Sequence, residues 1–343
     1  MHGCCSRAGC RIHPPRGREA EEENNEVTVN GSITVSVVVP TYRRPRQLQA
    51  CLEALAAQTM QEPWEVVVVD DGSPEPPVSS VESLVASRGW QLVRQPNAGP
   101  SAARNRGVRE ARGEFIAFTD DDCLPEPSWL SMLLQEARLR PHALVGGTTV
   151  NGLKGDFFAA TSQLIVDFVY EHFNANPDDG YFLASNNILC SRAWFQEVGG
   201  FDESFPRAGG EDRDFCDRWR MRGWPITWQS AARVEHRHGQ SFRQFVDLYI
   251  RYGRGAYRYQ AIRKERGSGT MLEDISFHKT LPRRVWRHLK RRGRVGSGIA
   301  TVAALSVWQV ANAAGFLLES ILGSDKRTIT RSQPAPSHRD LRG

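Results

Sequence analysis

The sequence predicts an α/β protein with a Rossmann-like, mainly parallel sheet and helices on both of its faces. Short apolar runs alternate with segments of helical spacing, an order that is typical of parallel sheets. The runs 35–39 and 66–69 consist almost entirely of valine, as expected of strands that are buried on both faces. We also expect a helical extension after residue 240.

The first half follows this alternation element by element. Pro40 ends the first strand because its nitrogen has no hydrogen to donate. The helix that follows has Leu48, Leu52 and Leu55 on one face. We predict strands at 35–39, 66–69, 91–93 and 115–118, and helices at 46–58, 78–87 and 101–111.

The second half is less regular, but it holds two further polar segments. Residues 184–187 precede an apolar strand, and 209–212 join two glycines to two acids. The glycines allow close backbone approach. The acids suit a helix N-terminus, so helix capping is an alternative explanation for Glu211 and Asp212. We predict a strand at 188–190 and helices at 193–198 and 213–222.

Three consecutive aspartates, Asp120, Asp121 and Asp122, follow the apolar run 115–119. Carboxylates this close repel one another and resist ionisation, and a divalent cation removes the repulsion. Oxygen ligands favour Mg2+ or Mn2+, which usually also take phosphate oxygens from a substrate. A solvated acidic turn is the alternative explanation.

Two other predicted strands also end in polar groups. Thr41 and Tyr42 follow the first strand, and the Asp-Asp-Gly-Ser segment 70–73 follows the second. In parallel sheets, ligands bind beyond the carboxyl ends of the strands, where such groups meet. The aspartates 120–122 therefore belong to a predicted cleft, which favours metal-assisted chemistry on a phosphorylated substrate over the solvated turn.

Length and charge limit the partners. The chain of 343 residues is long enough for one large domain or two small ones, and its net charge is +5. A basic run at 283–294 could meet nucleic acid or anionic lipid, or remain a solvated face. Trp286 alone interleaves with it as the aromatics of single-strand binders do, so we expect no nucleic-acid partner.

Seven cysteines give no disulfide framework. Cys51, Cys123, Cys190 and Cys216 lie in apolar segments and are predicted to be small core residues. The N-terminal cysteines lie in the polar stretch 1–31, for which we predict a disordered tail, with metal binding as the alternative. That stretch lacks the apolar core of a secretory signal, so a reduced cytosolic setting is expected.

Six ordered motifs resemble those of the family 2 glycosyltransferases, which have the GT-A fold and transfer sugars from nucleotide diphosphates. The motifs lie at 37–42 (VVVPTY), 68–73 (VVDDGS), 97–107 (NAGPSAARNRG), 118–122 (FTDDD), 199–203 (GGFDE) and 209–212 (GGED). Each is weak alone, but together they span most of residues 35–240 in order. The resemblance implies a GT-A glycosyltransferase domain at 32–240.

The resemblance also implies a role for each matching residue. A nucleotide-sugar donor would be held by Pro40, Thr41, Tyr42, Asp71, Arg104 and Asp121. A divalent cation, Mg2+ or Mn2+, would be held by Asp120, Asp122 and His236. Asp212 would be the catalytic base, with Glu211 in support. Asp71 would face the base, and uracil and thymine present the same edge, so UDP- or dTDP-sugars are expected rather than GDP-sugars.

The chemistry of sugar transfer makes the same demand for two acidic sites. The sugar–phosphate bond breaks through an oxocarbenium-like state, and the acceptor hydroxyl loses its proton to a carboxylate on the opposite side of the anomeric carbon. Attack from that side inverts the configuration. We therefore expect an inverting, metal-dependent glycosyltransferase that moves a hexosyl or deoxyhexosyl group to a glycan or glycolipid acceptor.

Two other functions remain open. A catalytically inactive sugar- or nucleotide-binding homologue is disfavoured by the presence of Asp120, Asp122 and Asp212 together. A nucleotidyltransferase that makes nucleotide sugars would need a glycine-rich, basic loop after the first strand, where residues 40–42 read Pro-Thr-Tyr instead.

The C-terminal segment 295–318 has no charged residue and is long enough, as a helix, to span a bilayer. We predict an amphipathic helix in the membrane interface, preceded by a basic run that meets anionic headgroups. A buried core helix and a true span are the alternatives. Its polar residues, namely Ser306, Gln309, Asn312 and Glu319, are predicted to share one helical stripe.

These predictions divide the rest of the chain into three parts. We expect a helical, basic extension at 241–294, a membrane-associating helix at 295–322 and a disordered tail at 323–343. The expected location is the cytoplasmic face of the cell membrane, where the protein and its acceptor would meet an anionic surface, or otherwise the cytoplasm.

Overall fold

A computed structural model describes residues 32–322, apart from 76, 177, 206–208, 270, 293 and 294. The tails predicted at 1–31 and 323–343, with the N-terminal cysteines, lie outside the described residues. The four cysteines predicted to be core residues are all buried free thiols. The part of the chain from residue 32 onward clusters as one unit, so the boundaries at 240 and 294 stay predictions.

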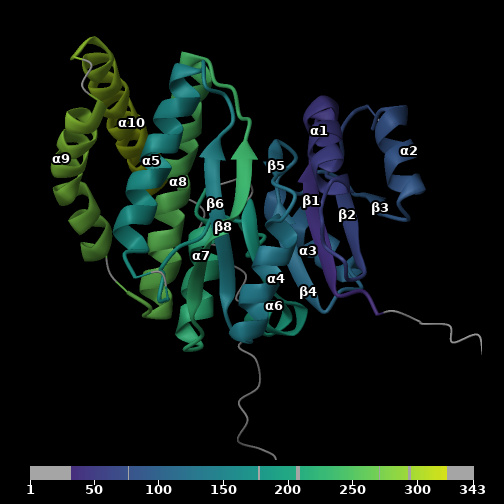
Figure 1. Ribbon diagram of the computed structural model, residues 1–343. Coiled ribbons are helices and arrows are strands. Elements are labelled where there is room, and N and C mark those ends of the chain that lie inside the picture. The colour runs from purple at the N-terminus through teal and green to yellow at the C-terminus, as the bar shows by residue number, and fades with distance from the viewer. Residues whose placement is uncertain are drawn as a thin grey trace, which may run out of the picture. The chain divides into compact units, whose positions relative to one another are not determined.

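Strands of the described chain form one sheet, as Figure 1 shows. They are β1 (Val35–Thr41), β2 (Trp64–Asp70), β3 (Gln91–Arg94), β4 (Phe115–Thr119), β5 (Cys123–Pro125), β6 (Leu144–Asn151), β7 (Asn187–Ser191) and β8 (Ile226–His236). Their order in the sheet is β3-β2-β1-β4-β7-β6-β8-β5.

The helices cover both faces of this sheet and continue beyond it. They are α1 (Pro45–Ala56), α2 (Ser79–Ser87), α3 (Pro100–Glu110), α4 (Trp129–Leu139), α5 (Phe157–Phe173), α6 (Arg192–Val198), α7 (Glu211–Met221), α8 (Phe242–Arg266), α9 (Leu272–Arg292) and α10 (Val295–Leu322). The α/β class and the C-terminal helical extension are thereby confirmed.

Successive residues of the central strands belong to hydrophobic cores on opposite faces of the sheet. Val37 packs with Leu52 of α1 and Leu130 of α4 on one face. Its neighbour Val38 belongs to the core on the other face, with Val108 of α3. Because both faces are covered by helices, the strands need apolar residues at consecutive positions, which explains the valine runs.

The first half of the sheet is parallel as predicted, and the second half is mixed. β1 pairs in parallel with β2 and β4, and β2 with β3. β7 is antiparallel to β4 and β6, and β5 is antiparallel to β8. The predictions did not include β5, β6 or β8. β6 contains Gly146 and Gly147, which obscure its strand character, yet a Cβ on Gly147 would overlap the carbonyl of Ala232 in β8.

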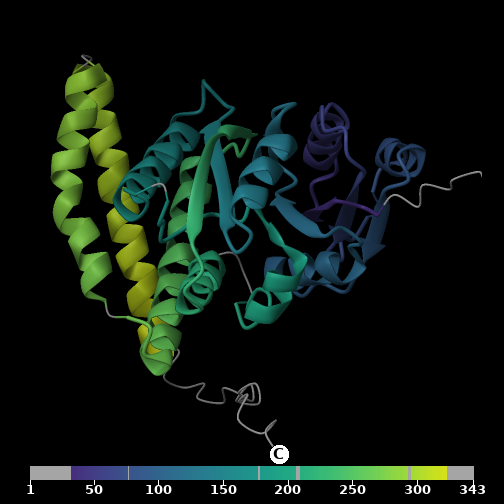
Figure 2. The same cartoon turned by 60° about the horizontal axis from the view of Figure 1, so that its bottom comes forward.

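The C-terminal helices and α5 share a core of their own. Phe168 of α5, Tyr249 of α8, Phe277 of α9 and Trp308 of α10 are buried together there. Figure 2 shows α9 and α10 side by side at one end of the sheet. α8 and α10 approach to backbone contact: a Cβ on Gly253 would overlap the carbonyl of Asn312, and a Cβ on Gly315 that of Ile250. Small residues allow this spacing, as in membrane helix pairs.

The two sides of α10 differ from the predicted amphipathic pattern. Glu319 does not lie on a water-facing stripe: it is buried, and its carboxylate pairs with Arg254 at 2.7 Å and Arg258 at 2.6 Å on α8. Gln309 donates to His278 of α9 at 3.2 Å. Ser306, in contrast, is exposed and donates to the carbonyl of Val302 in its own helix. The prediction of one shared polar stripe is therefore wrong, because these residues face different surroundings.

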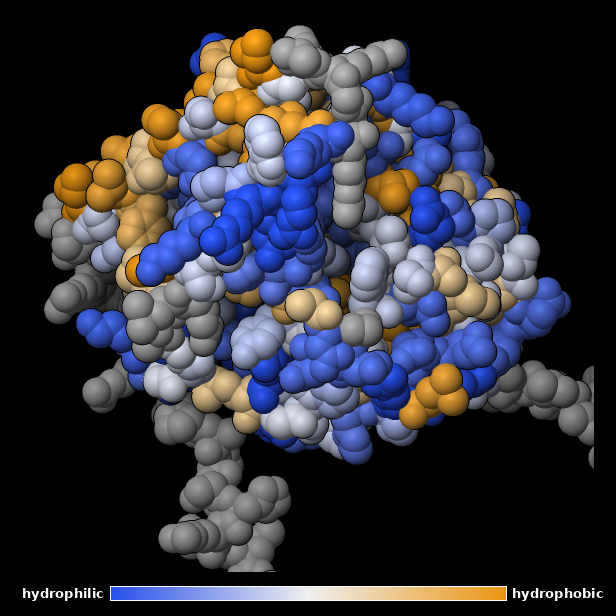
Figure 3. All heavy atoms as spheres, turned by 60° about the vertical axis from the view of Figure 1, so that its left-hand side comes forward, coloured by the Kyte–Doolittle hydropathy of each residue, from blue (hydrophilic) through white to orange (hydrophobic). Residues whose placement is uncertain are grey.

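The outward side of α10 is apolar instead. Most of its exposed residues follow helical spacing, and we call these the outer stripe: Ile299, Val302, Ala303, Ser306, Val310, Ala313, Leu317 and Ile321. Figure 3 shows hydrophobic side chains gathered at the margin of this flank beside a hydrophilic ridge. The stretch Gly298–Leu322 is long and apolar enough to cross a membrane by length and composition.

Candidate active site

One cavity of about 1300 Å³ lies at the carboxyl ends of the parallel strands. It forms there because β1, β2 and β4 are parallel neighbours, so the polar residues that follow them meet at one edge. All of the site residues predicted from the sequence line this cavity: Pro40, Thr41, Tyr42, Asp71, Arg104, Asp120, Asp121, Asp122, Glu211, Asp212 and His236.

Asp71 anchors a loop at the β2 end of the cavity. One of its carboxylate oxygens accepts from Gln95 Nε2 at 2.8 Å and from the backbone N–H of Ala98 at 2.9 Å. The other accepts from Asn97 Nδ2 at 3.1 Å and from the N–H of Gly99 at 2.9 Å. These contacts order the loop before α3, and the expected contact of Asp71 with a nucleobase stays a prediction.

Asp121, the middle aspartate, points into the site and joins it to β1. Its carboxylate accepts from Thr41 Oγ1 at 2.8 Å and from Arg44 Nη1 at 3.1 Å. Burial raises the pKa of Asp121 to about 7, although the charge of Arg44 opposes the rise. Arg44 also contacts Asp122 at 2.7 Å, so it holds two of the three aspartates together. The sequence analysis did not identify Arg44.

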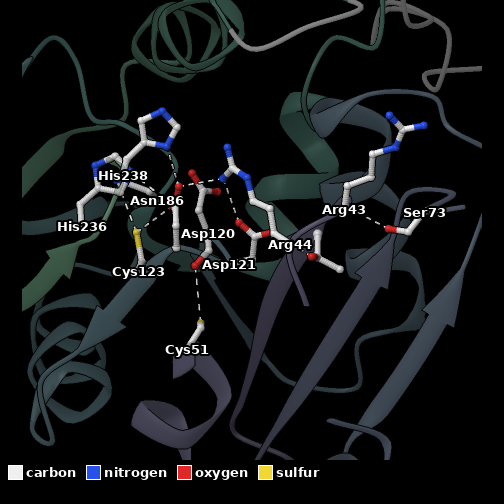
Figure 4. A network of polar contacts seen from close by, with 12 residues as sticks. Arg43, Arg44, Cys51, Ser73, Asp120, Asp121, Cys123, Asn186, His236 and His238 are labelled. Atoms are coloured by element: carbon white, nitrogen blue, oxygen red, sulfur yellow. Dashed lines mark hydrogen bonds and ion pairs between the residues drawn. The ribbon is translucent and has the colours of Figure 1, made fainter. Parts of the chain in front are cut away.

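Asp122 lies between two imidazoles. His236 Nε2 is 3.2 Å from its Oδ1, and His238 Nδ1 is 3.0 Å from its Oδ2. Figure 4 shows both rings on one side of the aspartates, with Arg44 on the other. Burial opposes ionisation of Asp122, but hydrogen bonds from both histidines hold its pKa well below the ordinary value. The antiparallel register of β5 and β8, which pairs Cys123 with His236, brings the rings there.

This group has the geometry of a cation site. Ligand atoms of Asp122, His236 and His238 all lie within 4.8 Å of one another. One carboxylate oxygen and two imidazole nitrogens fit Mn2+ better than Mg2+, which prefers oxygen ligands. His238 was not among the predicted ligands, but the i, i+2 spacing of the histidines was a usable signal, since alternate residues of a strand face the same side.

Asp120 has a different partner. Arg104 Nη2 contacts Asp120 Oδ1 at 2.7 Å, and Arg104 Nη1 lies 3.8 Å from Glu211 Oε1. The guanidinium is buried against the ring of Phe201, and its acidic neighbours raise its pKa although burial acts against them. Arg104 therefore links the aspartates after β4 to the acidic pair of α7. The predicted role of Asp120 as a metal ligand stays a prediction.

Glu211 and Asp212 begin α7 after two glycines with positive φ, Gly209 and Gly210. Glu211 accepts from the N–H of Gly209 at 2.5 Å, and Asp212 accepts from the N–H of Ser185 at 3.2 Å. Burial, followed by the charge of Asp212, raises the pKa of Glu211 to about 7. Burial also raises the pKa of Asp212. The N-cap of α7 is Gly210, and both acids lie in the first turn of the helix, so their roles as base and support stay predictions.

One oxygen of Asp212 is left for another molecule. Its Oδ1 is buried and has no hydrogen-bond partner among the described residues. A buried acceptor without a partner is unfavourable by about 1–3 kcal/mol. A hydroxyl group in the cavity would remove this penalty by donating to Asp212.

Helix α8 fixes the backbone of this acidic pair. A Cβ on Gly255 would overlap the carbonyl of Gly209, and a Cβ on Gly210 would come within 2.7 Å of the carbonyl of Gly255. Tyr252, one turn earlier on α8, packs its ring against Gly209 and lines the cavity. Sequence reasoning gave no signal for either contact, because α8 lies outside the six motifs.

Comparisons with known proteins agree with this geometry. The family model "Glycosyl transferase family 2" matches residues 36–199, and the model "N-terminal domain of galactosyltransferase" matches residues 177–240. The glycosyltransferase AglE of Haloferax volcanii is 34% identical over 259 residues, which cover 74% of this chain and 79% of that protein.

Two further relatives extend the comparison. A chondroitin synthase of Pasteurella multocida is 29% identical over 57% of this chain, which spans only 24% of that protein's length. A solved mannosyltransferase of Pyrobaculum calidifontis, in complex with GDP-Man and Mn2+, has 19% identity and a TM-score of 0.54 over 84% of this chain and 86% of that one. At this identity the structural likeness concerns the fold alone.

Proposed function

The chain belongs to glycosyl transferase family 2, a family of GT-A glycosyltransferases, and we propose from this that it transfers a sugar from a nucleotide diphosphate donor to a hydroxyl group of a glycan or glycolipid acceptor. The observation that carries the proposal is one cavity with two acidic groups, one after β4 and one at the start of α7, linked by Arg104. Sugar transfer needs separate sites for a leaving diphosphate and for a base.

The donor is proposed to lie between β1, β2 and β4. Thr41, Asp71 and Arg104 line this end, where the buried guanidinium of Arg104 offers charge to a diphosphate. A divalent cation held by Asp122, His236 and His238 would, when bound, neutralise charge on the leaving group. The Pyrobaculum mannosyltransferase, which shares the fold, was solved with GDP-Man and Mn2+, so it supports a cation and a nucleotide sugar but not the choice of nucleotide. UDP- or dTDP-sugars are the proposed donors.

Asp212 is proposed to be the base. Its unpartnered Oδ1 can accept a hydrogen bond from the acceptor hydroxyl and then its proton. Glu211 supports it, since burial and the charge of Asp212 raise the pKa of Glu211 to about 7, which favours a proton on Glu211 when Asp212 is ionised. Attack on the side of the anomeric carbon away from the diphosphate would invert its configuration.

The proposal is tested by ligand binding and by product stereochemistry. UDP, dTDP and GDP, each with and without Mn2+, are added to the full chain, and the melting temperature is recorded. UDP or dTDP with Mn2+ is expected to raise it more than either component alone. The anomeric configuration of the product is then determined by NMR. Transfer or slow hydrolysis of the matching α-linked donor sugar should give a β-configured product. No nucleotide binding in any condition would overturn the proposal.

We also propose that the protein lies on an anionic membrane surface. One side of α10 packs on α8, so lipid can reach only the exposed residues of its other sides, which supports an interfacial helix rather than a span. On α9, Arg283, Trp286, Arg287 and Lys290 are exposed at helical spacing. Basic residues around a tryptophan are typical of helices that meet anionic headgroups. The cytoplasmic face of the cell membrane is the proposed location.

A further inference from the structure

The cavity does not end at the acidic pair. It continues between the helices α5, α8, α9 and α10, beyond the strand ends that would hold the donor. Its total volume of about 1300 Å³ exceeds the roughly 300–1000 Å³ of most small-molecule sites. We call this part the helical branch, and its apolar lining includes Ile165, Val166, Leu248, Ile275, Ala313 and Leu317.

The helical branch combines apolar side chains with polar ones such as Gln163, Arg251 and Asn312, and some of the apolar side chains are left open. Met271 is 48% exposed and Ile275 is 40% exposed, although both line the cavity. Two of the polar side chains there, Gln309 and His278, are hydrogen-bonded to each other at 3.2 Å. Apolar side chains left open in this way favour an apolar occupant, because filling the branch would remove their surface from water.

The helical branch is also continuous with the outer stripe of α10. Leu317 belongs to the outer stripe, where it is 61% exposed, and it also lines the cavity. Ala313, one turn earlier, likewise belongs to the outer stripe and lines the cavity. An apolar path therefore runs from the proposed membrane face of α10, past Leu317, to the cavity that contains Asp212. A soluble glycan chain would gain nothing from such a path.

We propose that the helical branch binds the hydrocarbon chain of a membrane-anchored acceptor, whose hydroxyl-bearing headgroup then lies at Asp212. The inference rests on the proposed function for the role of Asp212, but the binding of a hydrocarbon chain can be tested by itself. It commits the acceptor to an amphiphile: the chain stays in contact with α10 while the headgroup reaches the catalytic carboxylates.

Trp308 supplies an internal reporter. It is buried and lines the helical branch, and bromine atoms quench indole fluorescence on contact. The probe is tetradecyl β-glucoside brominated at mid-chain, titrated into the full chain below its micelle concentration. We expect saturable quenching that disappears in Trp308→Phe. The octyl homologue should bind at least roughly tenfold more weakly, since each buried methylene contributes about fourfold. Equal quenching in Trp308→Phe would overturn the proposal.

A matched pair of variants locates the chain. Ala313→Phe fills the branch, whereas Ala303→Phe adds the same ring to the same helix on the outer stripe but outside the cavity. Probe affinity should fall about tenfold or more in Ala313→Phe and stay within about twofold in Ala303→Phe. Equal losses in both variants would contradict the assigned branch.

Nucleotide binding separates this inference from the proposed function. If UDP with Mn2+ raises the melting temperature of every variant but the probe does not bind, the hydrocarbon site alone is wrong. If the probe binds as described but no nucleotide does, the proposed function fails and the apolar site stands.

Discussion

His238 Nδ1 lies 3.0 Å from Asp122 Oδ2, although the two residues are 116 positions apart in the sequence. The contact exists because β5 and β8 pair antiparallel, so the end of β8 lies beside the aspartates that follow β4. His236 contacts the other oxygen of the same carboxylate. The geometry thus adds a second imidazole to the proposed cation site.

His238→Ala should weaken Mn2+-dependent nucleotide binding, because it removes one of three ligand groups. Asp122→Asn should abolish the Mn2+ dependence and transfer together, since it removes both a hard ligand and its charge. Thermal shift with UDP across a Mn2+ titration measures both. Glu235→Gln is the control on the same strand, because its side chain faces the other way. Unchanged Mn2+ dependence in both site variants would exclude this cation site.

Asp212→Asn should leave nucleotide and Mn2+ binding nearly intact and cut turnover by about a hundredfold or more, the usual scale for a general base. Glu211→Gln should lower turnover less. Donor KM and kcat are measured separately for each variant. If Asp212→Asn raised donor KM as strongly as it lowered kcat, Asp212 would be a donor contact rather than the base.

Glu211 should make stability depend on pH. Its pKa rises from 4.5 to about 7 on folding, chiefly through burial, so the folded state binds the proton more tightly than the unfolded state. Its contribution is therefore largest below about pH 4.5, and stability is lost as pH rises through about 7. Glu211→Gln should reduce the loss and be more stable than wild type at pH 8, by a few kcal/mol at most, while Asp121 and Asp212, whose pKa values are also raised, keep their part of it. Urea denaturation at pH 5 and pH 8 measures the free energy of unfolding of both proteins. An identical pH dependence in wild type and Glu211→Gln would refute the raised pKa of Glu211.

Gly255→Ala should impair catalysis although alanine favours helices by about 1 kcal/mol. The added methyl group would overlap the carbonyl of Gly209 and displace the start of α7, which carries Asp212. Turnover should fall at least about tenfold while UDP binding is kept. Gly155→Ala is the matched control, because a Cβ there meets open space. Normal turnover in Gly255→Ala would show that α8 does not position the acidic pair.

Charges on the outer stripe should release the protein from membranes. Ile299 and Val310 are each 70% exposed on α10, and burying each in lipid contributes about 1.5–3 kcal/mol. The double variant Ile299→Asp, Val310→Asp should lose most sedimentation with vesicles that contain anionic lipid. Leu139→Asp, on the exposed surface of α4, should sediment normally.

High salt should release wild type only in part, since it screens the charges alone. If wild type does not sediment at low salt, the membrane location is wrong.

The sequence by itself determined the parallel half of the fold and part of the residues that line the site, but not Arg44 or His238. Valine runs and helical spacing depend on neighbours a few residues apart, so β1, β2, β4 and the helices between them could be predicted. Parallel strands bring their carboxyl ends to one edge, and therefore the strand pattern alone was enough to place Thr41, Asp71 and the aspartates 120–122 together.

The tertiary structure decided the features that depend on register and on packing between distant segments. Only the pairing of β5 with β8 puts His238 on Asp122, and only the glycine contacts of α8 fix Gly209 and the acidic pair. The same holds for α10. Its composition indicated an apolar helix, but which side packs inward depends on the ion pairs of Glu319 with Arg254 and Arg258 of α8. Such choices follow from contacts across the chain, which no local pattern contains.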